Sequence, residues 1–460
     1  MCTKLFDEDF QIDDTCINIL NKLQTHGYEA YLVGGCVRDF LMGKIPHDYD
    51  ITTNAKPEEV MDIFDKTIPT GIKYGTVTVI EDDKSFEITT YRSDGVYKDG
   101  RRPCNVEFGN TIEEDLCRRD FTINAIAYDP IKKILIDPFG GTNDIGDKIL
   151  KTVRNPYERF LEDALRIIRG YRFAVKYDFD VEKNTYESMR EFLPMIKNVS
   201  SERINDELLK IFSFDLSAKD VVFLWNMLSE IFPVLKEMNG VEQENPHHRF
   251  TLDMHTIHSI GFVSTLQREG LLNESVDPAE LRFALLFHDI GKLYTKTIDS
   301  NGVSHYYGHE KISAELMYDI LKEKKMPNKI IDNIVYLIKN HQKPLPNDLK
   351  GFMKWFNKEG SDNVYKLLAM KFADNSSQAM PMNIDSMKRI IGLANEALQE
   401  PMAKFSLKDL AIDGYDVIEL GFSGKMIGEI LRECFDLVTN GEIENDLYEI
   451  KEYIKKHKKK

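Results

Sequence analysis

The sequence predicts a multidomain protein in which a mixed α/β head, a β-sheet packed with helices, precedes an all-helical remainder. With 460 residues, the chain is too long for one compact core. Segments rich in β-branched and aromatic residues concentrate near the amino terminus, and from about residue 155 the apolar residues keep helical spacing. We therefore expect four domains: a head (1–150), a helical neck and body (151–245), a histidine-rich domain (246–376) and a helical tail (377–460).

The composition is that of an ordinary globular protein. Hydrophobic residues make up 42% and charged residues 30% of the chain, which is too apolar for a disordered protein. No run approaches the roughly 18 apolar residues that cross a bilayer, and the acidic start lacks the apolar core of a signal peptide. The six cysteines form no Cys-x-x-Cys pair, so neither a disulfide framework nor a thiolate zinc site is indicated. We expect a cytoplasmic protein without a membrane partner.

The net charge of −16 gives no support to nucleic-acid binding, which usually requires a basic surface. A local basic patch can nevertheless exist on an acidic chain. Residues 159–176 carry four arginines and a lysine at helix-like spacing, whereas the lysine-rich end at 455–460 is typical of a solvated terminus.

The head is expected to alternate helices and short strands. A helix with apolar spacing covers 14–23 and ends near Gly27. Residues 92–105, rich in Gly, Asp, Arg and Pro, are expected to form a polar loop. Strands are expected over residues 31–33, 49–53, 76–80 and 86–91.

Capping signals mark the helices of the remaining chain. Helix starts are expected at Asn155-Pro156, Ser200-Ser201-Glu202 and Asp277-Pro278. The polar run at 245–248 marks a domain boundary, and eight of the eleven histidines lie between His247 and His341. The histidines therefore define a second region of chemical interest.

The first candidate site segment is Gly34-Gly35-Cys36-Val37-Arg38-Asp39, directly after a predicted strand. Glycines allow a close approach of backbone to phosphate, and the N–H groups that open the following helix favour anions. Arg38 adds a planar fork of donors that suits phosphate. Taken alone, a Gly-Gly pair is most often only a turn.

The second segment is His47-Asp48-Tyr49-Asp50-Ile51-Thr52. In a strand, Asp48 and Asp50 point to the same face, where two carboxylates repel unless a cation lies between them. Hard oxygen ligands of this kind suit Mg²⁺, which also binds substrate phosphates. By itself, such a segment is more often a turn that ends on an exposed strand than a metal site.

The third segment is Arg118-Arg119-Asp120-Phe121-Thr122-Ile123-Asn124-Ala125, which alone could form a surface ion pair. Together and in this order, the three segments resemble the class II tRNA nucleotidyltransferase and bacterial poly(A) polymerase family. The resemblance covers roughly residues 28–215. Further segments similar to motifs of that family are Asp137–Gly141 with Asp144 (hinge), Glu162–Arg169 (nucleotide-selecting helix) and Ser201–Ile204 with Glu207 (neck).

The resemblance implies two-metal nucleotidyl transfer to the 3′ end of tRNA from CTP and ATP. Asp48 and Asp50 would be the catalytic residues that hold Mg²⁺. Gly35 and Arg38 would bind the triphosphate. Arg119, Asp120 and Asn124 would meet the ribose and phosphate region.

The segment around Asp163 accounts for base choice without a template. If residues 159–176 form one helix, Asp163 and Arg166 share a face and together imitate a pairing edge for cytosine and adenine. Glu162 would brace the Arg166 guanidinium from four residues away. Arg169 and Arg172 would continue the basic face toward phosphates. The alternative is an exposed helix with ion pairs at turn spacing.

The product is expected to be CCA rather than a poly(A) tail. Residues 91–103 resemble the flexible loop that CCA-adding members need for the final adenosine, and residues 69–76 resemble the CCA-adding branch. The basic segment typical of bacterial poly(A) polymerases is not evident there. A poly(A) polymerase remains the alternative.

The histidine-rich domain resembles an HD-type metal phosphohydrolase, including the stretch Leu285–Lys292. An adjacent His-Asp pair supplies a nitrogen and an oxygen ligand, and six ligands would allow two divalent metal ions, whose identity the ligand types leave open. Two alternatives are a hydrolase with a nucleotide-binding regulatory head, and a degenerate HD domain that only binds tRNA. The candidate ligands are His255, His288, Asp289, His309, His341 and Asp374.

Overall fold

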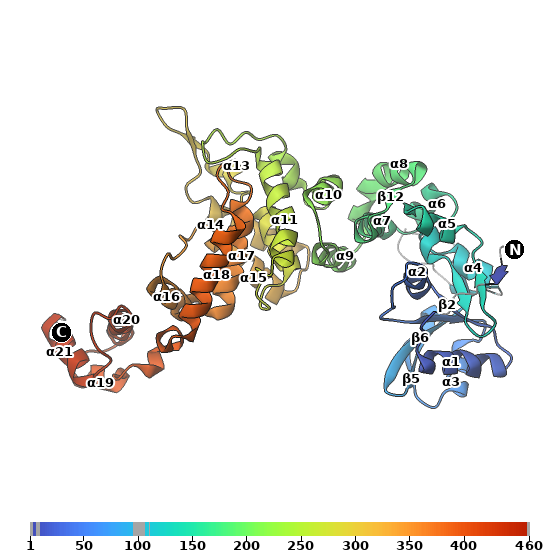
Figure 1. Ribbon diagram of the computed structural model, residues 1–460, viewed down its shortest axis with the longest axis horizontal. Helices are drawn as coiled ribbons and strands as arrows, with labels where there is room; N and C mark the ends of the chain where they lie inside the picture. The colour runs from blue at the N-terminus through green and yellow to red at the C-terminus, as the bar shows by residue number, and fades with distance from the viewer. Residues whose placement is uncertain (1–2, 6–9, 95–105, 110, 458–460) are drawn as a thin grey trace. The chain divides into compact units, whose positions relative to one another are not determined.

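The computed structural model describes residues 3–5, 10–94, 106–109 and 111–457. The chain divides into two compact units, which are coloured by residue number in Figure 1. The first comprises Met1–Phe214 with Leu224–Pro233, and the second comprises Asp215–Phe223 with Val234–Lys460. The expected mixed α/β head and helical remainder are confirmed. The finer division at residues 150, 245 and 376 stays a prediction.

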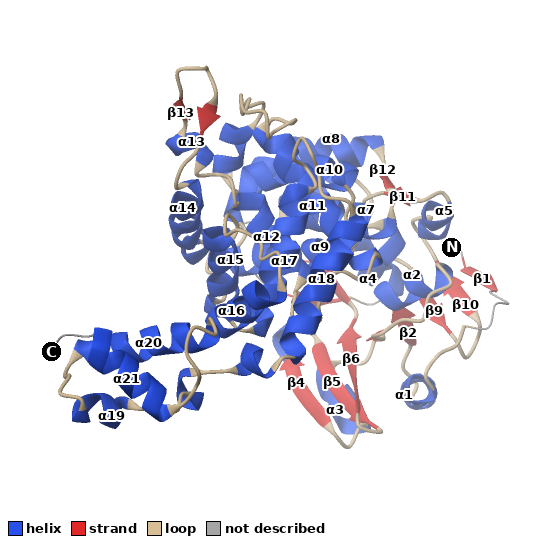
Figure 2. Ribbon diagram, turned by 60° about the vertical axis from the view of Figure 1, so that its left-hand side comes forward, coloured by secondary structure: helices blue, strands red, loops and turns tan. Residues whose placement is uncertain are grey.

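The first unit is built on an eight-stranded mixed sheet, drawn in red in Figure 2. Strand β2 pairs antiparallel with β3, which places Val33 opposite Asp50, and β3 pairs parallel with β6. The end of β2 and the start of β3 therefore lie at the same edge of the sheet. In sheet order the strands are β1 (Thr3–Leu5), β10 (Ile134–Ile136), β9 (Ala127–Asp129), β2 (Ala30–Val33), β3 (Asp50–Thr53), β6 (Lys84–Thr90), β5 (Thr76–Glu81) and β4 (Thr67–Gly71).

The predicted strands are present with small shifts in their ends. Strand β3 begins at Asp50 rather than at Tyr49, so Asp48 precedes it in a bend. The predicted polar loop was partly wrong, because β7 (Arg92–Asp94) pairs with β8 (Val106–Phe108). The part of that loop between residues 95 and 105 lies outside the described residues.

Helices of the first unit begin at the expected capping residues. Asn155 accepts a hydrogen bond from Tyr157 N and opens α6, and Ser200 precedes α9. The helices are α1 (Asp14–Thr25), α2 (Gly35–Leu41), α3 (Pro57–Ile63), α4 (Ile112–Cys117), α5 (Gly141–Gly146), α6 (Pro156–Glu162), α7 (Leu165–Tyr177), α8 (Lys183–Phe192) and α9 (Ser201–Ser213), with 3₁₀ turns η1 (Ile72–Tyr74), η2 (Thr122–Asn124) and η3 (Leu193–Asn198).

The stretch 159–176 is two helices, and the expectation of a single helix was wrong. Asp163 has extended backbone angles, φ −149° and ψ 103°, between α6 and α7. Its carboxylate accepts a hydrogen bond from Leu165 N at 3.0 Å. Aspartate favours such helix-capping positions because its side chain satisfies an otherwise unpaired N–H group.

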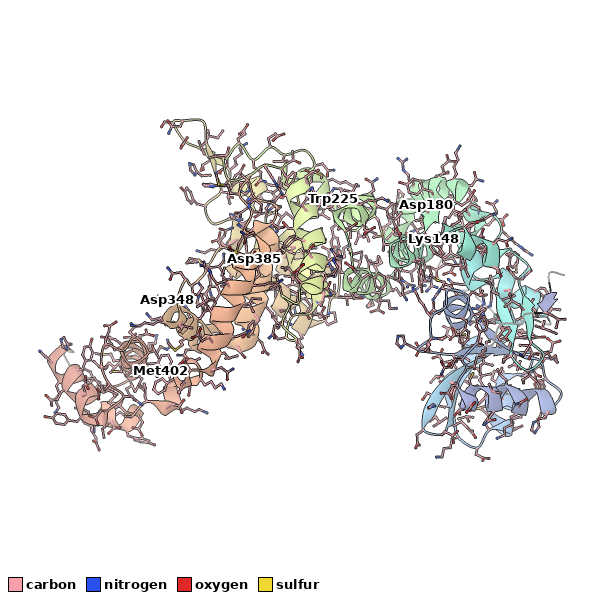
Figure 3. All side chains as sticks on the ribbon, in the orientation of Figure 1. Lys148, Asp180, Trp225, Asp348, Asp385 and Met402 are labelled. Atoms are coloured by element: carbon pink, nitrogen blue, oxygen red, sulfur yellow. The ribbon has the colours of Figure 1, made fainter. Side chains whose placement is uncertain are left out.

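A small parallel sheet fixes both ends of the α6–α7 segment. Strand β11 (Ile149–Leu150) pairs with β12 (Asp180–Val181), and Asp180 N donates to Lys148 O at 2.9 Å. Figure 3 labels Lys148 and Asp180, which lie close together. Because β11 precedes α6 and β12 follows α7, the chain enters and leaves this segment at neighbouring points.

The second unit is almost entirely helical, apart from a hairpin of β13 (Thr297–Ile298) and β14 (Ser304–His305). Asp277 caps α12 through the N–H groups of Ala279 and Glu280, as expected. Its helices are α11 (Leu252–Arg268), α12 (Pro278–Phe287), α13 (Lys292–Thr295), α14 (His309–Glu323), α15 (Asn328–Asn340), α16 (Leu349–Glu359), α17 (Ser361–Asn375), α18 (Ile384–Gln399), α19 (Gly414–Glu419), α20 (Lys425–Thr439) and α21 (Leu447–His457); α10 (Ala218–Ile231) is divided between the units, and η4 (Pro233–Met238), η5 (Pro401–Lys404) and η6 (Leu407–Asp409) are 3₁₀ turns.

The core of the second unit lies among α11, α12, α15 and α17. Phe283 and Phe287 on α12 are fully buried, as is Ile334 on α15. Burying one such side chain contributes on the order of 2 kcal/mol. The last three helices enclose a separate cluster that includes Val417, Ile450 and other buried apolar residues. Within the described residues, no helix has both the length and the apolar character needed to cross a membrane.

Candidate active site

A polar cavity of about 580 Å³ lies in the first unit and gathers the candidate residues of the head. Asp48 and Glu162 are not among the residues that line it, although both were predicted site residues. Its lining residues are Gly34, Gly35, Arg38, Asp50, Arg92, Arg118, Arg119, Asp120, Asn124, Asp163, Leu165, Arg166, Arg169, Arg172, Phe173, Lys176 and Arg203.

Gly34 leaves space at the wall of this cavity. It adopts a φ of +71°, a left-handed conformation that favours glycine. A Cβ atom there would lie 2.8 Å from Arg119 Nη1 and 3.5 Å from Asp50 Oδ2. Any side chain would therefore displace the cation that faces the Asp50 carboxylate. Helix α2 begins at the next residue, Gly35, which also lines the cavity.

Arg38 is buried and held on several sides. Its Nη1 donates to Asn124 Oδ1 at 2.6 Å, and its Nη2 donates to Asp39 Oδ1 at 2.8 Å. The guanidinium also lies 4.5 Å from the centre of the Tyr177 ring. A guanidinium fixed in this way is preorganised to bind an anion, because little rotamer freedom remains to be lost.

Asp50 is one of three carboxylates that line the cavity, together with Asp120 and Asp163, whereas Asp48 does not line it. Desolvation raises the pKa of Asp50, Arg119 opposes this change, and the negative charge of Asp48 adds to the rise. The two carboxylates therefore interact, although Asp48 is exposed and does not share a strand face with Asp50. Their hard oxygens and mutual repulsion fit a divalent cation such as Mg²⁺.

Asp120 organises the opposite wall. It accepts hydrogen bonds from Asn124 Nδ2 at 3.1 Å and from Arg169 Nε at 2.7 Å. Burial by itself raises the pKa of Asp120. The combined opposite effect of Arg169, Asn124 and Arg166 is larger, and the pKa falls to about 2. Asp120 is therefore an anion that fixes Asn124 and Arg169, rather than a group open to substrate phosphate.

Asp163 and Arg166 both face the cavity, although they do not share a helix. Asp163 is paired with Arg203 Nη2 at 2.6 Å. Arg166 Nη1 donates to Glu162 Oε2 at 2.5 Å, so the expected brace between Glu162 and Arg166 is present. Arg172 pairs with Glu207 rather than pointing freely into the cavity. The sequence indicated the segment of Arg203 only as a neck motif and gave no signal for its pairing with Asp163, 40 residues away.

The second unit brings the six candidate metal ligands together. Asp289 Oδ2 lies 3.3 Å from His255 Nε2 and 3.4 Å from His288 Nε2, whereas its Oδ1 lies 3.1 Å from His309 Nε2. His341 Nε2 lies 3.6 Å from the same Oδ1. Asp374 Oδ1 completes the first group at 3.0 Å from His255 Nε2. One carboxylate thus lies between two pairs of imidazoles.

Backbone carbonyls orient three of the four histidines. The Nδ1 atoms of His288, His309 and His341 lie 2.7–2.8 Å from the backbone carbonyls of Leu285, Tyr306 and Ile338. Because a carbonyl only accepts, these Nδ1 atoms carry the proton and each neutral ring presents a lone pair at Nε2. This second layer of hydrogen bonds is typical of metal-binding histidines.

The cluster therefore needs positive charge at its centre. His309 Nε2 and His341 Nε2 are 3.2 Å apart, and the buried Asp289 Oδ1 accepts no hydrogen bond. Burial by itself lowers the pKa of His255. The combined opposite effect of Asp289 and Asp374 is larger, and the pKa rises to about 9. Without a metal cation, protons must separate these lone pairs. The donor set fits divalent metal ions with a preference for imidazole and carboxylate ligands.

Lys292 and Ser377 are functional neighbours that the sequence predictions omitted. Lys292 Nζ lies 2.7 Å from Asp289 Oδ2. Ser377 Oγ lies 2.7 Å from His255 Nδ1. The spacing of three residues between Asp289 and Lys292 could have indicated the first contact. No local spacing could have indicated the second, which joins residues 122 positions apart.

Three family models match successive parts of the chain. Residues 30–151 match the poly A polymerase head domain, and residues 178–238 match the probable RNA and SrmB-binding site of polymerase A. Residues 255–379 match the HD domain. Fold and sites thus define a protein class with a polymerase-type nucleotide-binding head and an HD domain on one chain.

Curated relatives match nearly the whole length. The chain is 31% identical over 445 residues to the CCA-adding enzyme of Enterococcus faecalis, covering 96% of this chain and 95% of the relative. It is 33% identical over 448 residues to the Staphylococcus saprophyticus CCA-adding enzyme, covering 96% and 98%. The chain therefore belongs to the family of CCA-adding enzymes.

Solved structures agree with this assignment. The CCA-adding enzyme of Bacillus stearothermophilus in complex with CTP superposes with a TM-score of 0.68 at 27% identity, covering 96% of each chain. The fold is also shared with the Thermotoga maritima CCA-adding enzyme complexed with tRNA, at a TM-score of 0.60 and 19% identity over 97% of each chain. The predicted family and its HD domain are thus confirmed.

Proposed function

We propose that this protein adds or repairs the 3′-terminal CCA of tRNA from CTP and ATP and releases pyrophosphate. The observation that carries the proposal is the cavity of the first unit, where Asp50 faces a wall of arginines. Asp48 and Asp50 would hold Mg²⁺. Bound there, Mg²⁺ would supply charge stabilisation at the attacked phosphate and a more acidic 3′-hydroxyl.

The chain's own residues bind and orient the nucleotide. Arg38 and Arg119 offer fixed donors to the triphosphate, with Gly34 leaving room for the close approach. Asp163 and Arg166 offer an acceptor and donors to the edge of the base. Base choice thus requires no nucleic-acid template, because the protein supplies the hydrogen-bonding partners.

Replacement of one carboxylate tests this proposal. Asp50→Asn removes a negative charge and keeps the side-chain shape, so CCA addition to tRNA lacking its 3′ end should fall by about a thousandfold or more. Asp62→Asn is the matched control on an exposed face of α3. Products would be sequenced after incubation of the full-length protein with CTP and ATP. Unchanged extension by the Asp50 variant contradicts the assigned chemistry.

A poly(A) polymerase is distinguished by its product. With tRNA that ends in CC and with ATP alone, a CCA-adding enzyme stops after one adenosine. The length of the extended RNA measures this directly. Long homopolymer tails would support the alternative and contradict our proposal.

A second function, metal-dependent phosphoester cleavage, is favoured by the cluster around Asp289. The inward lone pairs of the histidines, and Asp289 Oδ1, which accepts no hydrogen bond, suit divalent metal ions, which would polarise a phosphoester oxygen. Lys292, whose Nζ lies beside Asp289 Oδ2, would offer a further positive charge to the bound phosphoester. Two alternatives are a hydrolase with a nucleotide-binding regulatory head, which would cleave phosphoesters but add no CCA, and a degenerate HD domain that only binds tRNA.

Cleavage of bis(p-nitrophenyl) phosphate and p-nitrophenyl phosphate by the full-length protein measures this activity in the presence of Mn²⁺, Ni²⁺ or Mg²⁺. Asp289→Asn should abolish it and leave CCA addition largely intact. His305→Ala, outside the cluster, is the control and should retain both activities. A wild-type protein that cleaves neither compound with any of these metals would contradict this second function and favour a degenerate HD domain that only binds tRNA.

A further inference from the structure

The Arg166 guanidinium is held from behind by three acceptors. Its Nη1 donates to Glu162 Oε2 at 2.5 Å and to the backbone carbonyl of Arg159 at 3.2 Å, and its Nη2 donates to the carbonyl of Arg118 at 2.9 Å. Only Glu162 among these acceptors is a side chain, so the direction of its carboxylate helps to set the plane of the guanidinium.

Arg159 fixes that carboxylate from the other side. Its Nη2 pairs with Glu162 Oε1, and its Nη1 donates to Cys117 O at 3.2 Å. Because Arg159 binds one oxygen of Glu162 and Arg166 binds the other, the carboxylate cannot rotate without breaking an ion pair. Arg159 is buried, with a side chain only 9% exposed, and it is not among the residues that line the nucleotide cavity.

The position of Arg159 follows from the local fold. Asn155 and Pro156 start α6, which ends at Glu162, so Arg159 and Glu162 are three residues apart on one face of a short helix. The chain then breaks at Asp163, and no continuous helix holds Arg166 in register with Glu162. The ion pairs of Glu162 therefore provide the side-chain link across the break.

We propose that Arg159 is a positioning residue for base selection, which acts through Glu162 on Arg166 and never touches the nucleotide. This inference rests on the proposed function. Cytosine and uracil differ in whether an amino group or a carbonyl occupies one position of the pairing edge, so discrimination requires a fixed guanidinium. A guanidinium that can tilt accepts either base. Loss of Arg159 thus relaxes selectivity and spares the chemistry at Asp50.

The test compares two arginine-to-lysine variants of the full-length protein. Arg159→Lys keeps the charge and removes the fork that joins Glu162 to Cys117 O. The ratio of kcat/KM for CTP to that for UTP, measured with tRNA lacking CCA, should fall about tenfold or more, with kcat for CTP within about threefold of wild type. Arg154→Lys is the matched control, because Arg154 is exposed near Arg159 and Glu162 and has the same charge. Its ratio should not change.

A second variant identifies the route. Glu162→Gln should lower the same ratio, and adding Arg159→Lys to it should cause no further loss, because both changes break one connection. If Arg159→Lys fails to fold, as judged by thermal unfolding, Glu162→Gln alone decides the matter. An unchanged ratio in a folded variant, an equal loss for all nucleotides, or a fully additive double variant overturns the inference. A wild-type protein that adds no nucleotide instead overturns the proposed function.

Discussion

At the scale of single residues, Asp120 illustrates how the cavity wall is kept rigid. Its carboxylate is buried between Asn124 and Arg169, and Asn124 in turn accepts the hydrogen bond of Arg38. One anion thus orders two side chains, Asn124 and Arg169, that line the cavity. A buried pair of this kind is costly to break, because the remaining charge is left without a partner.

The pH dependence of stability should report this anion. The pKa of Asp120 is about 2 in the folded protein, against 3.8 for the ordinary group. Since the folded pKa is lowered, the stabilisation of on the order of 2 kcal/mol is complete above about pH 4 and is lost as the pH falls toward 2. The difference in free energy of unfolding between wild type and Asp120→Asn should be constant from pH 7 to 5 and shrink below pH 4. A difference that stays constant down to pH 3 would contradict this prediction.

Residue chemistry was partly predictable from the sequence. The Gly-Gly, Asp-x-Asp and Arg-Arg-Asp segments each indicated residues that line one cavity, although Asp48 of the second segment does not. The partners of these side chains were not predictable, because Arg172 on α7 and Asp163 just before α7 meet Glu207 and Arg203 on α9 only through tertiary packing. Sequence spacing predicts which side chains are neighbours within one helix or strand. It does not predict contacts between residues on two different elements.

At the scale of elements, the main difference from expectation is the break between α6 and α7. Helical spacing of arginines continues through Asp163, so periodicity alone predicted one helix. The preference of aspartate to cap the following helix overrode it. Asp163 reaches the cavity from an extended stretch of backbone, and Arg166 reaches it from α7. The expected single helical face therefore does not describe how the two side chains are placed.

Helix α5 should be intolerant of a side chain at its first residue. A Cβ atom on Gly141 would lie 2.1 Å from Thr122 O, and Thr122 begins the turn that carries Asn124. Gly141→Ala should therefore lower the free energy of unfolding by about 1–3 kcal/mol or more and raise KM for CTP.

The same helix offers the control for this prediction. Gly146 has nothing within 4 Å of an added Cβ atom. Gly146→Ala should leave KM unchanged and stabilise the protein by up to about 1 kcal/mol, since alanine favours helices. Chemical denaturation and steady-state kinetics of both variants provide the measurement. Equal effects of the two substitutions would show that the close approach to Thr122 is unimportant.

At the scale of the whole molecule, the fold class and the order of its parts were predictable. The change from strands to helices near residue 155 reflects a change in hydrophobic period, which sequence reports well. Strands β1, β4, β9 and β10 of the main sheet were not predicted; length alone does not explain this, because β2 and β3, with four residues each, were. Local hairpins join β4 to β5 and β9 to β10, whereas pairing between distant segments joins β1 to β10 and β9 to β2.

Metal removal should affect the two units differently. A metal ion bound only by the folded second unit stabilises it by about 3 kcal/mol at a hundredfold excess over Kd. After chelation, adding Ni²⁺ should raise the thermal transition of the second unit in wild type and in His305→Ala, but not in Asp289→Asn. Calorimetry of the full-length protein would measure this shift. An equal shift in Asp289→Asn would place the ion elsewhere.

The shared carboxylate of Asp289 has an evolutionary consequence. Two imidazole pairs face its two oxygens, so a single substitution at Asp289 removes a ligand from both groups. The nucleotide cavity, by contrast, distributes its contacts over many side chains. A lineage could thus abandon the second chemistry by one missense change and retain the first. Descendants that keep the helical shell but have lost this aspartate would then be remnants of a bifunctional ancestor.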